Sequence, residues 1–311
     1  MGVYFGLDTS NYTTSAAVLD SRGISMKKLL LPVKHGERGL RQSDAVFHHV
    51  KQLPQVCKDL IKGKKIDAIG VSYAPRRAEG SYMPCFNVGV SHALVISEML
   101  CVPVYMFSHQ EGHIAAALYS ADRFDLMGKP FLAFHVSGGT TDALFVSPDG
   151  ENPLNCQLLG TSLDLHAGQL IDRVGVMLGL HFPCGGELEK LAIKYSGNLH
   201  IKPCIKGNDI CLSGVENICK KMLDQNEPNE KIAAYCISYI AASIDAVTQR
   251  ITQELKGLPV IYSGGVMRNS IIKACLQSKY DAYFAQPEFS SDNAAGIAVF
   301  AKYVHENRIR I

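Results

Sequence analysis

The stretch PFLAFHVSGGTTDALFVS, residues 130–147, decides the fold class of this chain. An apolar run leads into a tight turn at Ser137, Gly138 and Gly139, and a second apolar run follows. Residues 3–20, VYFGLDTSNYTTSAAVLD, have the same plan with a polar turn after Asp8. Two hairpins of like plan, about 130 residues apart, predict a duplicated architecture.

A third segment, LPVIYSGGVMRNSIIKACL at residues 258–276, predicts a strand, a turn at Ser263, Gly264 and Gly265, and a helix. Helical periodicity predicts further helices within residues 48–63, 163–180, 230–257 and 290–306. Strands that alternate with helices are typical of an α/β protein.

The composition is that of a globular protein with one large domain or two. The chain has 311 residues, 47% hydrophobic and 19% charged, and a net charge of +2. This balance argues against a general nucleic-acid-binding surface and leaves a local basic patch open. We expect no membrane span, and the ten cysteines without a CxxC pair predict reduced thiols in the cytoplasm.

The glycine-rich turns predict a nucleotide site. Gly-Gly after a buried strand lets the backbone approach a ligand, and its consecutive N–H groups attract phosphate oxygens. In the turn at Gly264 and Gly265, we expect the helix to begin just after the glycines and to direct its N-terminus toward an anion. The alternative is that both are merely tight turns.

Three carboxylates are candidates for a role beside these turns. Asp8 at the end of the first strand either positions a metal or water, or accepts hydrogen bonds within its own turn. Asp164 and Asp172 are eight residues apart and are expected to share a helical face. That pair either holds a ribose or a cation, or lies on the exposed surface.

The stretch SHQEGHIAAAL, residues 108–118, places His109 and His113 on one helical face. They are either metal ligands or polar residues of a solvated helix. Gly112 costs about 1 kcal/mol relative to Ala in a helix, so something is expected to approach closely there. Asp292 would complete a His/His/Asp shell suited to zinc or ferrous iron, whereas Glu111 is misplaced for an HExxH protease.

Ser137 and Ser263 precede Gly-Gly, but neither lies in a GxSxG or SxxK motif and no partner base is implied nearby. A serine hydrolase is therefore not expected.

Taken together, these motifs resemble the TsaD family of tRNA N6-adenosine threonylcarbamoyltransferases, formerly labelled sialoglycoprotein endopeptidases. The matching segments are GLDTS, GLRQSDAVFHHV, SHQEGHIAAAL, VSGGTTDALFV, LGTSLDLHAGQLIDRVGVMLGL, LSGVENI, SGGVMRN and SSDNAAGIAV. The resemblance implies the actin/sugar-kinase/heat-shock-protein fold, called ASKHA, with a nucleotide cleft between two α/β domains. We expect the N-terminal domain at 1–106 plus about 292–311, and the second at 107–291.

The resemblance also implies the site. His109, His113 and Asp292 would bind one divalent metal, Fe²⁺ or Zn²⁺, and Asp8 and Ser137 would be catalytic. The ligand would be an adenylate, namely threonylcarbamoyl-AMP, ATP or AMP. The residues expected to bind it are Ser137, Gly138, Gly139, Asp164, Gly168, Asp172, Gly185, Gly264, Gly265 and Asn269.

The implied reaction transfers threonylcarbamoyl from threonylcarbamoyl-AMP to N6 of adenosine-37 in tRNA. The implied partners are tRNA, a TsaB-like paralogous subunit and a TsaE-like small ATPase, and a homodimer is left open.

This chain departs from the family pattern at several positions, so it is interpreted as a diverged, short paralogue. Two hypotheses remain beside the first: a carbamoyltransferase with another acceptor, and a nucleotide-binding scaffold or regulator. Arg76 and Arg77, in place of the family's Gly-Pro-Gly loop, either bind phosphate or pair with Glu79. The other departures are Tyr12 in the segment Asn11-Tyr12-Thr13, Thr140 after the glycines, Leu165 after Asp164, and Gln169.

Overall fold

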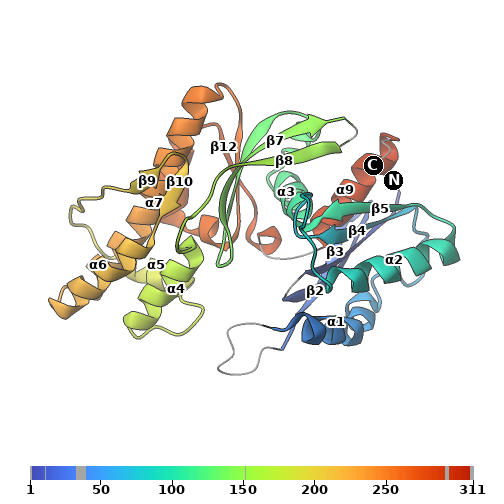
Figure 1. Cartoon of the computed structure of the whole chain (residues 1–311), viewed down its shortest axis with the longest axis horizontal. Helices are drawn as coiled ribbons and strands as arrows, with labels where there is room; N and C mark the ends of the chain where they lie inside the picture. The colour runs from blue at the N-terminus through green and yellow to red at the C-terminus, as the bar shows by residue number, and fades with distance from the viewer. Residues whose placement is uncertain (1, 11, 33–39, 151, 291–293, 309–311) are drawn as a thin grey trace. The chain divides into compact units, whose positions relative to one another are not determined.

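Two mixed five-stranded sheets organise the described part of the chain, as a computed structural model shows (Figure 1). The structure describes residues 2–10, 12–32, 40–150, 152–290 and 294–308. The chain divides into two compact units. The first comprises Met1–Lys129, Ser147–Cys156 and Glu288–Ile311, and the second Pro130–Val146 and Gln157–Pro287.

The first sheet has the order β3-β2-β1-β4-β5. Strand β1 pairs antiparallel with β2 and parallel with β4; β2 and β3 are antiparallel, and β4 and β5 are parallel. The strands are β1 (Tyr4–Ser10), β2 (Thr13–Asp20), β3 (Gly23–Leu30), β4 (Ala68–Ala74) and β5 (Val104–Ser108).

Helices cover both faces of this sheet. On one face α1 (Gln42–Cys57) and α2 (Phe86–Leu100) pack on apolar side chains such as Leu7 and Val71. On the other face α9 (Ala295–Glu306) lies so close that a Cβ at Gly6 would be 2.6 Å from the carbonyl oxygen of Ala294. Helix α3 (His109–Ser120) packs on α9, and a 3₁₀ turn (Phe124–Leu126) follows it.

The second sheet has the order β12-β11-β6-β7-β8. Strand β6 pairs antiparallel with β7 and parallel with β11, as β1 does with β2 and β4. The shared strand order confirms the duplication predicted from the two hairpins. The strands are β6 (Phe131–Val136), β7 (Thr141–Asp149), β8 (Asn152–Gly160), β11 (Val260–Ser263) and β12 (Ala282–Phe284).

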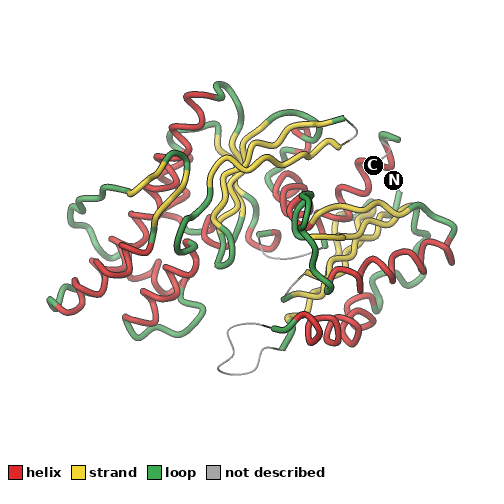
Figure 2. The backbone as a smooth tube through the Cα atoms, in the orientation of Figure 1, coloured by secondary structure: helices red, strands yellow, loops and turns green. Residues whose placement is uncertain are grey.

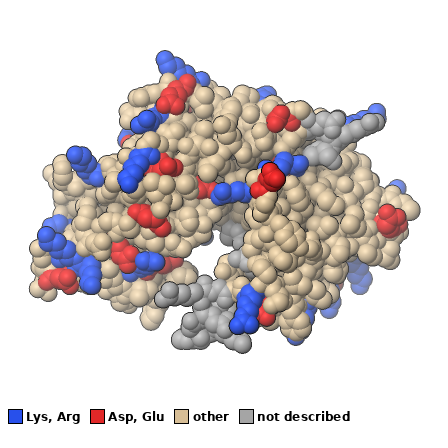
Figure 3. All heavy atoms as spheres, in the orientation of Figure 1, with Lys and Arg blue, Asp and Glu red and all other residues tan. Residues whose placement is uncertain are grey.

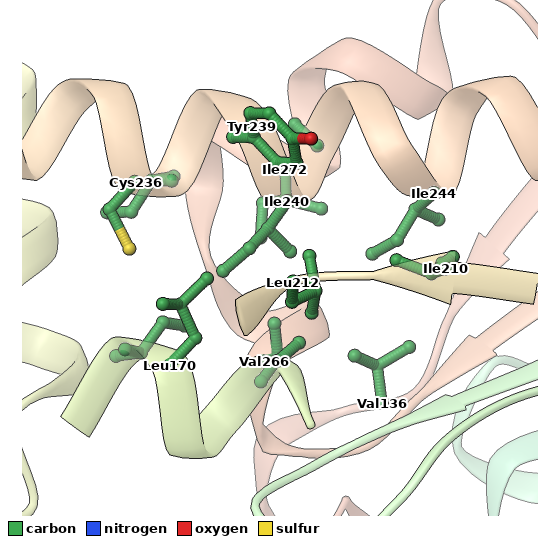
Figure 4. Close-up of a cluster of buried hydrophobic side chains, with 14 of the residues drawn as sticks. Val136, Leu170, Ile210, Leu212, Cys236, Tyr239, Ile240, Ile244, Val266 and Ile272 are labelled. Atoms are coloured by element: carbon green, nitrogen blue, oxygen red, sulfur yellow. The ribbon is translucent and has the colours of Figure 1, made fainter. Parts of the chain in front are cut away.

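The core of the second unit is built around α7 (Asn229–Glu254). Its predicted apolar stripe is buried at Ile232, Cys236 and Ile240. Figure 4 draws Cys236 and Ile240 in one apolar cluster with Leu170 of helix α4 (Ala167–Met177) and Ile210 of strand β10 (Asp209–Cys211). Across the sheet, the rings of Phe134, Tyr262 and Phe284 stack with centroids 5.2 and 5.0 Å apart.

Among the described helices, α7 is also the one long and apolar enough to cross a membrane, but 67% of its most apolar segment is buried inside the protein. It is therefore a core helix.

The remaining elements of the second unit surround this core (Figure 2). They are α4 (Ala167–Met177), α5 (Gly185–Ile193), β9 (Cys204–Lys206), β10 (Asp209–Cys211), α6 (Ser213–Asp224) and α8 (Ser270–Gln277). Strands β9 and β10 form a small antiparallel hairpin of their own.

The units differ from the domain boundaries expected at residues 106/107 and 291/292. The first unit extends to Lys129 and takes in Ser147–Cys156. One reason is that α3 packs directly against α9 through glycines, and another is that Asn152 hydrogen-bonds to Glu111 of α3. These contacts join residues far apart in the sequence, so a local sequence pattern does not show which segments meet.

Candidate active site

The first candidate group is the histidine pair at the start of α3. The Nε2 atoms of His109 and His113 lie 2.9 Å apart, and the ring centroids are separated by 4.4 Å. The helix begins directly after β5, so the pair lies at the carboxyl end of a parallel strand. That is where open α/β sheets place ligands.

Asp8 connects the end of β1 to this pair. Its Oδ2 accepts a hydrogen bond from Nδ1 of His109 at 2.7 Å, and its Oδ1 accepts one from the backbone N–H of Ser10 at 2.9 Å. The carboxylate is 1% exposed. Asp8 therefore accepts a bond within its own turn, as one of the two alternatives predicted, and it also orients an imidazole, which the sequence did not predict; its positioning of a metal or water stays a prediction.

The donor set fits a divalent transition metal. Two nitrogens about 2.1 Å from one ion stand about 3.0 Å apart at the right angles of octahedral coordination and about 3.4 Å apart at tetrahedral angles. The 2.9 Å between the Nε2 atoms is close to the first value, and it is also a hydrogen-bond distance. A carboxylate behind Nδ1 is the usual outer partner of a metal-bound histidine. Within the described ranges, no group of three or more His, Cys, Asp or Glu side chains forms a metal cluster. Asp292, the predicted third ligand, lies outside the described residues.

The first turn of α3 is held by a capping box that the sequence analysis missed. Ser108 Oγ accepts from the N–H of Glu111 at 3.2 Å, and Glu111 Oε2 accepts from the N–H of Ser108 at 2.6 Å. The signal was present, since Ser-x-x-Glu before a helix is the capping-box pattern.

Gly112 serves helix packing, as the expectation of a close approach suggested. A Cβ there would lie 2.8 Å from Cδ1 of Ile297 in α9. A Cβ on Gly296 would come within 1.8 Å of the carbonyl oxygen of Gly112. The histidine pair is therefore carried by a helix that is fixed against α9 by backbone contact.

The second candidate group lies in the second unit, at the turn of Ser137, Gly138 and Gly139. The N–H of Ser137 donates to the carbonyl of Thr140 at 2.7 Å, and the N–H of Gly139 donates to Ser137 Oγ at 3.3 Å. No described atom lies within 4 Å of a Cβ built on Gly138 or Gly139. This open space is what a turn that receives a ligand requires.

Two other predicted glycines pack against the same turn. A Cβ on Gly168 would lie 2.6 Å from the backbone nitrogen of Gly138, and the N–H of Gly168 donates to the carbonyl of Ser137 at 3.0 Å. Gly264 has φ +97°, and its Cβ would lie 2.2 Å from the carbonyl oxygen of Val136. The structure thus brings together Ser137, Gly138, Gly168 and Gly264.

The helix expected directly after Gly264 and Gly265 starts later. A 3₁₀ turn, Gly265–Arg268, intervenes, and α8 begins at Ser270. The Oδ1 of Asn269 caps α8 by accepting from the N–H groups of Ile271 and Ile272 at 3.0 and 3.2 Å. The expected helix start directly after the glycines was therefore wrong, and a side chain already satisfies two of the N–H groups at the start of α8.

The expectation that Asp164 and Asp172 share a helical face was also wrong. Asp164 precedes α4 and lies at the start of α6, where it accepts from Leu212 N at 2.8 Å and Ser213 Oγ at 2.6 Å. Partial burial raises the pKa of Asp164, but the hydrogen bonds outweigh it and leave the pKa lower than usual. Asp172 on α4 accepts from the N–H of Cys184, beside Gly185 at the start of α5.

Ser263 has a neighbouring base that the sequence did not reveal, because Nδ1 of His135 lies 3.2 Å from its Oγ. The serine is nevertheless 3% exposed, and its Oγ donates to the carbonyl of Phe134 at 3.1 Å. A buried hydroxyl engaged in this way does not serve as a nucleophile.

Three of the departures from the family pattern have local explanations in the structure. Leu165 is 5% exposed and belongs to the core, where a second aspartate would be costly. Gln169 accepts from the N–H of His166 at 3.4 Å, at the start of α4. Arg77 pairs with Glu111 and not with Glu79, which was one of the two alternatives left open, and its Nε lies 2.8 Å from Oε1 of Glu111.

Comparison with solved structures identifies the class of fold. Full-length HypF in a phosphate- and nucleotide-bound form matches with a TM-score of 0.61 at 12% identity, over 97% of this chain and 56% of that one. A ROK family glucokinase from Streptomyces griseus matches with a TM-score of 0.55 at 12% identity, over 97% of this chain and 100% of that one. Component A of (R)-2-hydroxyglutaryl-CoA dehydratase from Acidaminococcus fermentans matches with a TM-score of 0.57 at 12% identity, over 97% of this chain and 98% of that one. The protein has the ASKHA fold.

Sequence comparison then identifies the family. The model of the TsaD family, tRNA N6-adenosine threonylcarbamoyltransferase, matches residues 33–299, and the chain belongs to this family. A relative of that name from Thermosipho melanesiensis is 29% identical over 96% of this chain and 93% of its own length. A probable bifunctional tRNA threonylcarbamoyladenosine biosynthesis protein from Thermoplasma acidophilum is 27% identical, and this chain spans 57% of it.

Proposed function

We propose that this protein transfers a threonylcarbamoyl group from threonylcarbamoyl-AMP to N6 of adenosine-37 in tRNA, with the help of a bound Fe²⁺ or Zn²⁺. Family membership supports a transferase in tRNA modification. The observation that carries the metal-dependent form of the proposal is the 2.9 Å separation of the two Nε2 atoms, with Asp8 behind one of them.

His109 and His113 would hold the metal, together with Asp292. When bound, the ion would supply Lewis acidity and a template for the carbamoyl donor. With Nδ1–H of His109 donating to Asp8, Nε2 of His109 carries the lone pair that would bind a metal; in the structure this nitrogen lies within hydrogen-bond distance of Nε2 of His113. Asp8 therefore fixes both the tautomer and the direction of the imidazole.

The turn at Ser137 would receive the adenylate. The space beside Gly138 and Gly139 would admit phosphate oxygens, although the N–H of Gly139 already donates to Ser137 Oγ, and Gly168 packs against the turn. Asp172 and Gly185 mark a second point, at the start of α5, where a ribose hydroxyl could be bound. These ligand assignments, with those of Asp164, Gly264, Gly265 and Asn269, remain part of the proposal.

The direct test uses a strain in which this gene is the sole source of the activity, with the donor-forming enzyme retained. Mass spectrometry of its tRNA should detect threonylcarbamoyladenosine, and the His109→Ala strain should lack it. If the wild-type gene yields none although the purified protein binds zinc and AMP, tRNA is the wrong acceptor.

Partners form part of the proposal. The net charge of +2 is small for a tRNA-binding protein, and in the view of Figure 3 the described basic side chains are interspersed with acidic ones. A further subunit that shares the tRNA surface would overcome this limit. Such a subunit, either TsaB-like or a second copy of this chain, would bind at helix α2, where the apolar side chains of Val95 and Met99 are 60% and 79% exposed. A TsaE-like ATPase and a cytoplasmic location stay predictions.

A further inference from the structure

A buried polar cluster surrounds the carboxylate of Glu111 at the start of α3. Glu111 is 1% exposed, and Arg77 is its charged partner: Nε lies 2.8 Å from Oε1, and Nη2 lies 3.4 Å from Oε2. This pairing uses the planar fork of an arginine, which a lysine does not reproduce. Arg77 comes from residues 75–80, PRRAEG, where the chain departs from the family's Gly-Pro-Gly loop.

Two further donors complete the cluster. The N–H of Ser108 donates to Oε2 at 2.6 Å, and the Nδ2 of Asn152 donates to Oε1 at 2.9 Å. The carboxylate therefore ties together the loop after β4, the start of α3 and the start of β8. A buried carboxylate is stable when donors of this kind surround it, and it is strongly destabilising when its cation is removed.

The cluster lies within the turn that carries the histidine pair. Glu111 is between His109 and His113, and its capping bonds with Ser108 set the backbone at the first residue of the helix. Two carboxylates thus define where the Nε2 atoms point: Asp8 acts on the ring of His109, and Glu111 acts on the helix start.

The guanidinium of Arg77 is engaged by the protein itself. Besides Glu111, its Nη2 lies 3.5 Å from the carbonyl oxygen of Met106, and its Cζ lies 5.9 Å from the ring centroid of Tyr73. These contacts favour an internal role over the phosphate-binding role considered from the sequence.

We propose that Arg77 is a positioning residue for the histidine pair: by holding the buried Glu111 carboxylate, it keeps the first turn of α3 in the geometry that presents both imidazoles to a metal. Arg77 acts through Glu111 and touches neither histidine. The proposal rests on the proposed function as far as the metal is concerned, but the geometry of the turn can be measured without one.

The first experiment measures backbone hydrogen exchange in the metal-free Arg77→Met protein. Without the cation, the buried carboxylate is drawn toward water and its bond to Ser108 weakens. We expect exchange at the amides of Glu111 and Gly112 to accelerate about tenfold or more, whereas the amides of α9 remain as in the wild type. Wild-type exchange in the first turn would overturn the proposal.

The second experiment titrates Co²⁺ and Zn²⁺ into the same proteins. Arg77→Met should weaken binding by about tenfold, the lower end of what the loss of an outer-shell partner costs. Arg77→Lys keeps a cation and should recover part of the affinity. The double variant Arg77→Met with Glu111→Gln should bind better than Arg77→Met alone, because no unpaired charge remains buried.

The control and the outcomes separate this inference from the proposed function. Arg22→Met removes an arginine whose side chain is 80% exposed and should change neither exchange nor affinity. If the wild-type protein binds neither metal, the proposed function fails, and the exchange experiment still decides the role of Arg77. If the wild type binds metal and Arg77→Met binds it with the same affinity, Arg77 has no positioning role. If Arg77→Met does not fold, the same measurements are made on Arg77→Lys.

Discussion

The crossing of α3 and α9 allows a sharp prediction, because two glycines meet there with different neighbours. In Gly296→Ala the new Cβ would lie 1.8 Å from the carbonyl oxygen of Gly112 and 2.7 Å from the nitrogen of Ala116. Both atoms belong to the backbone of α3, so no side chain can rotate away. To restore the ordinary contact distance of 3.4 Å, the helices must separate by roughly 1.5 Å.

The expected cost follows from this separation. Overpacking a close-packed contact lowers the free energy of unfolding by about 1–3 kcal/mol or more, whereas the higher helix propensity of Ala relative to Gly raises it by about 1 kcal/mol. We expect Gly296→Ala to lower the free energy of unfolding by about 2 kcal/mol. Because α3 carries the histidine pair, the shift should also weaken Co²⁺ binding. Denaturant unfolding followed by circular dichroism, and a metal titration, measure the two effects.

Gly112→Ala is the matched control. Its Cβ would lie 2.8 Å from Cδ1 and 3.1 Å from Cγ1 of Ile297, which are the movable end of a side chain. The gain in helix propensity should offset most of this strain and keep the change within about 1 kcal/mol. Adding Ile297→Val to Gly112→Ala should remove more of the strain. The reasoning is refuted if Gly296→Ala is as stable as the wild type, or if Gly112→Ala is the more damaging of the two.

Three further predictions concern charge and the second candidate group. Asp8→Asn should weaken Zn²⁺ binding about tenfold in a folded protein, and unchanged calorimetric affinity would rule out its orienting role. Burial lowers the pKa of His49 to about 4, so below about pH 6.5 the unfolded state binds a proton that the folded state does not. The free energy of unfolding should therefore fall by up to about 3 kcal/mol between pH 6.5 and 4. In urea titrations, His49→Gln should reduce this pH dependence. Gly168→Ala would place a Cβ 2.6 Å from the nitrogen of Gly138 and should lower AMP affinity severalfold; an AMP affinity equal to that of the wild type would show that this turn does not bind the adenylate.

Local patterns in the sequence were enough for much of the architecture. The alternation of strands and helices, the duplication of the hairpin plan and the buried stripe of α7 are all set by near neighbours. Each of these features follows from the spacing of apolar residues within one helix or strand, so it can be detected without knowing what that element packs against. The same is true of the histidine pair, whose spacing of four residues places both rings on one side of α3. The capping box of Ser108 and Glu111 is equally local, because Ser-x-x-Glu before a helix is its sequence pattern.

The long-range contacts of these side chains could be seen only in the tertiary structure. Asp8 meets His109 across 101 residues, Arg77 meets Glu111 across 34, and Asp164 reaches Leu212 across 48. Such pairings depend on strand order and on how closely helices approach, and neither property is encoded in a local period. The sequence by itself thus determined which side chains could carry chemistry, whereas packing decided which carboxylate orients an imidazole and which one caps a helix, because those roles exist only once distant segments touch.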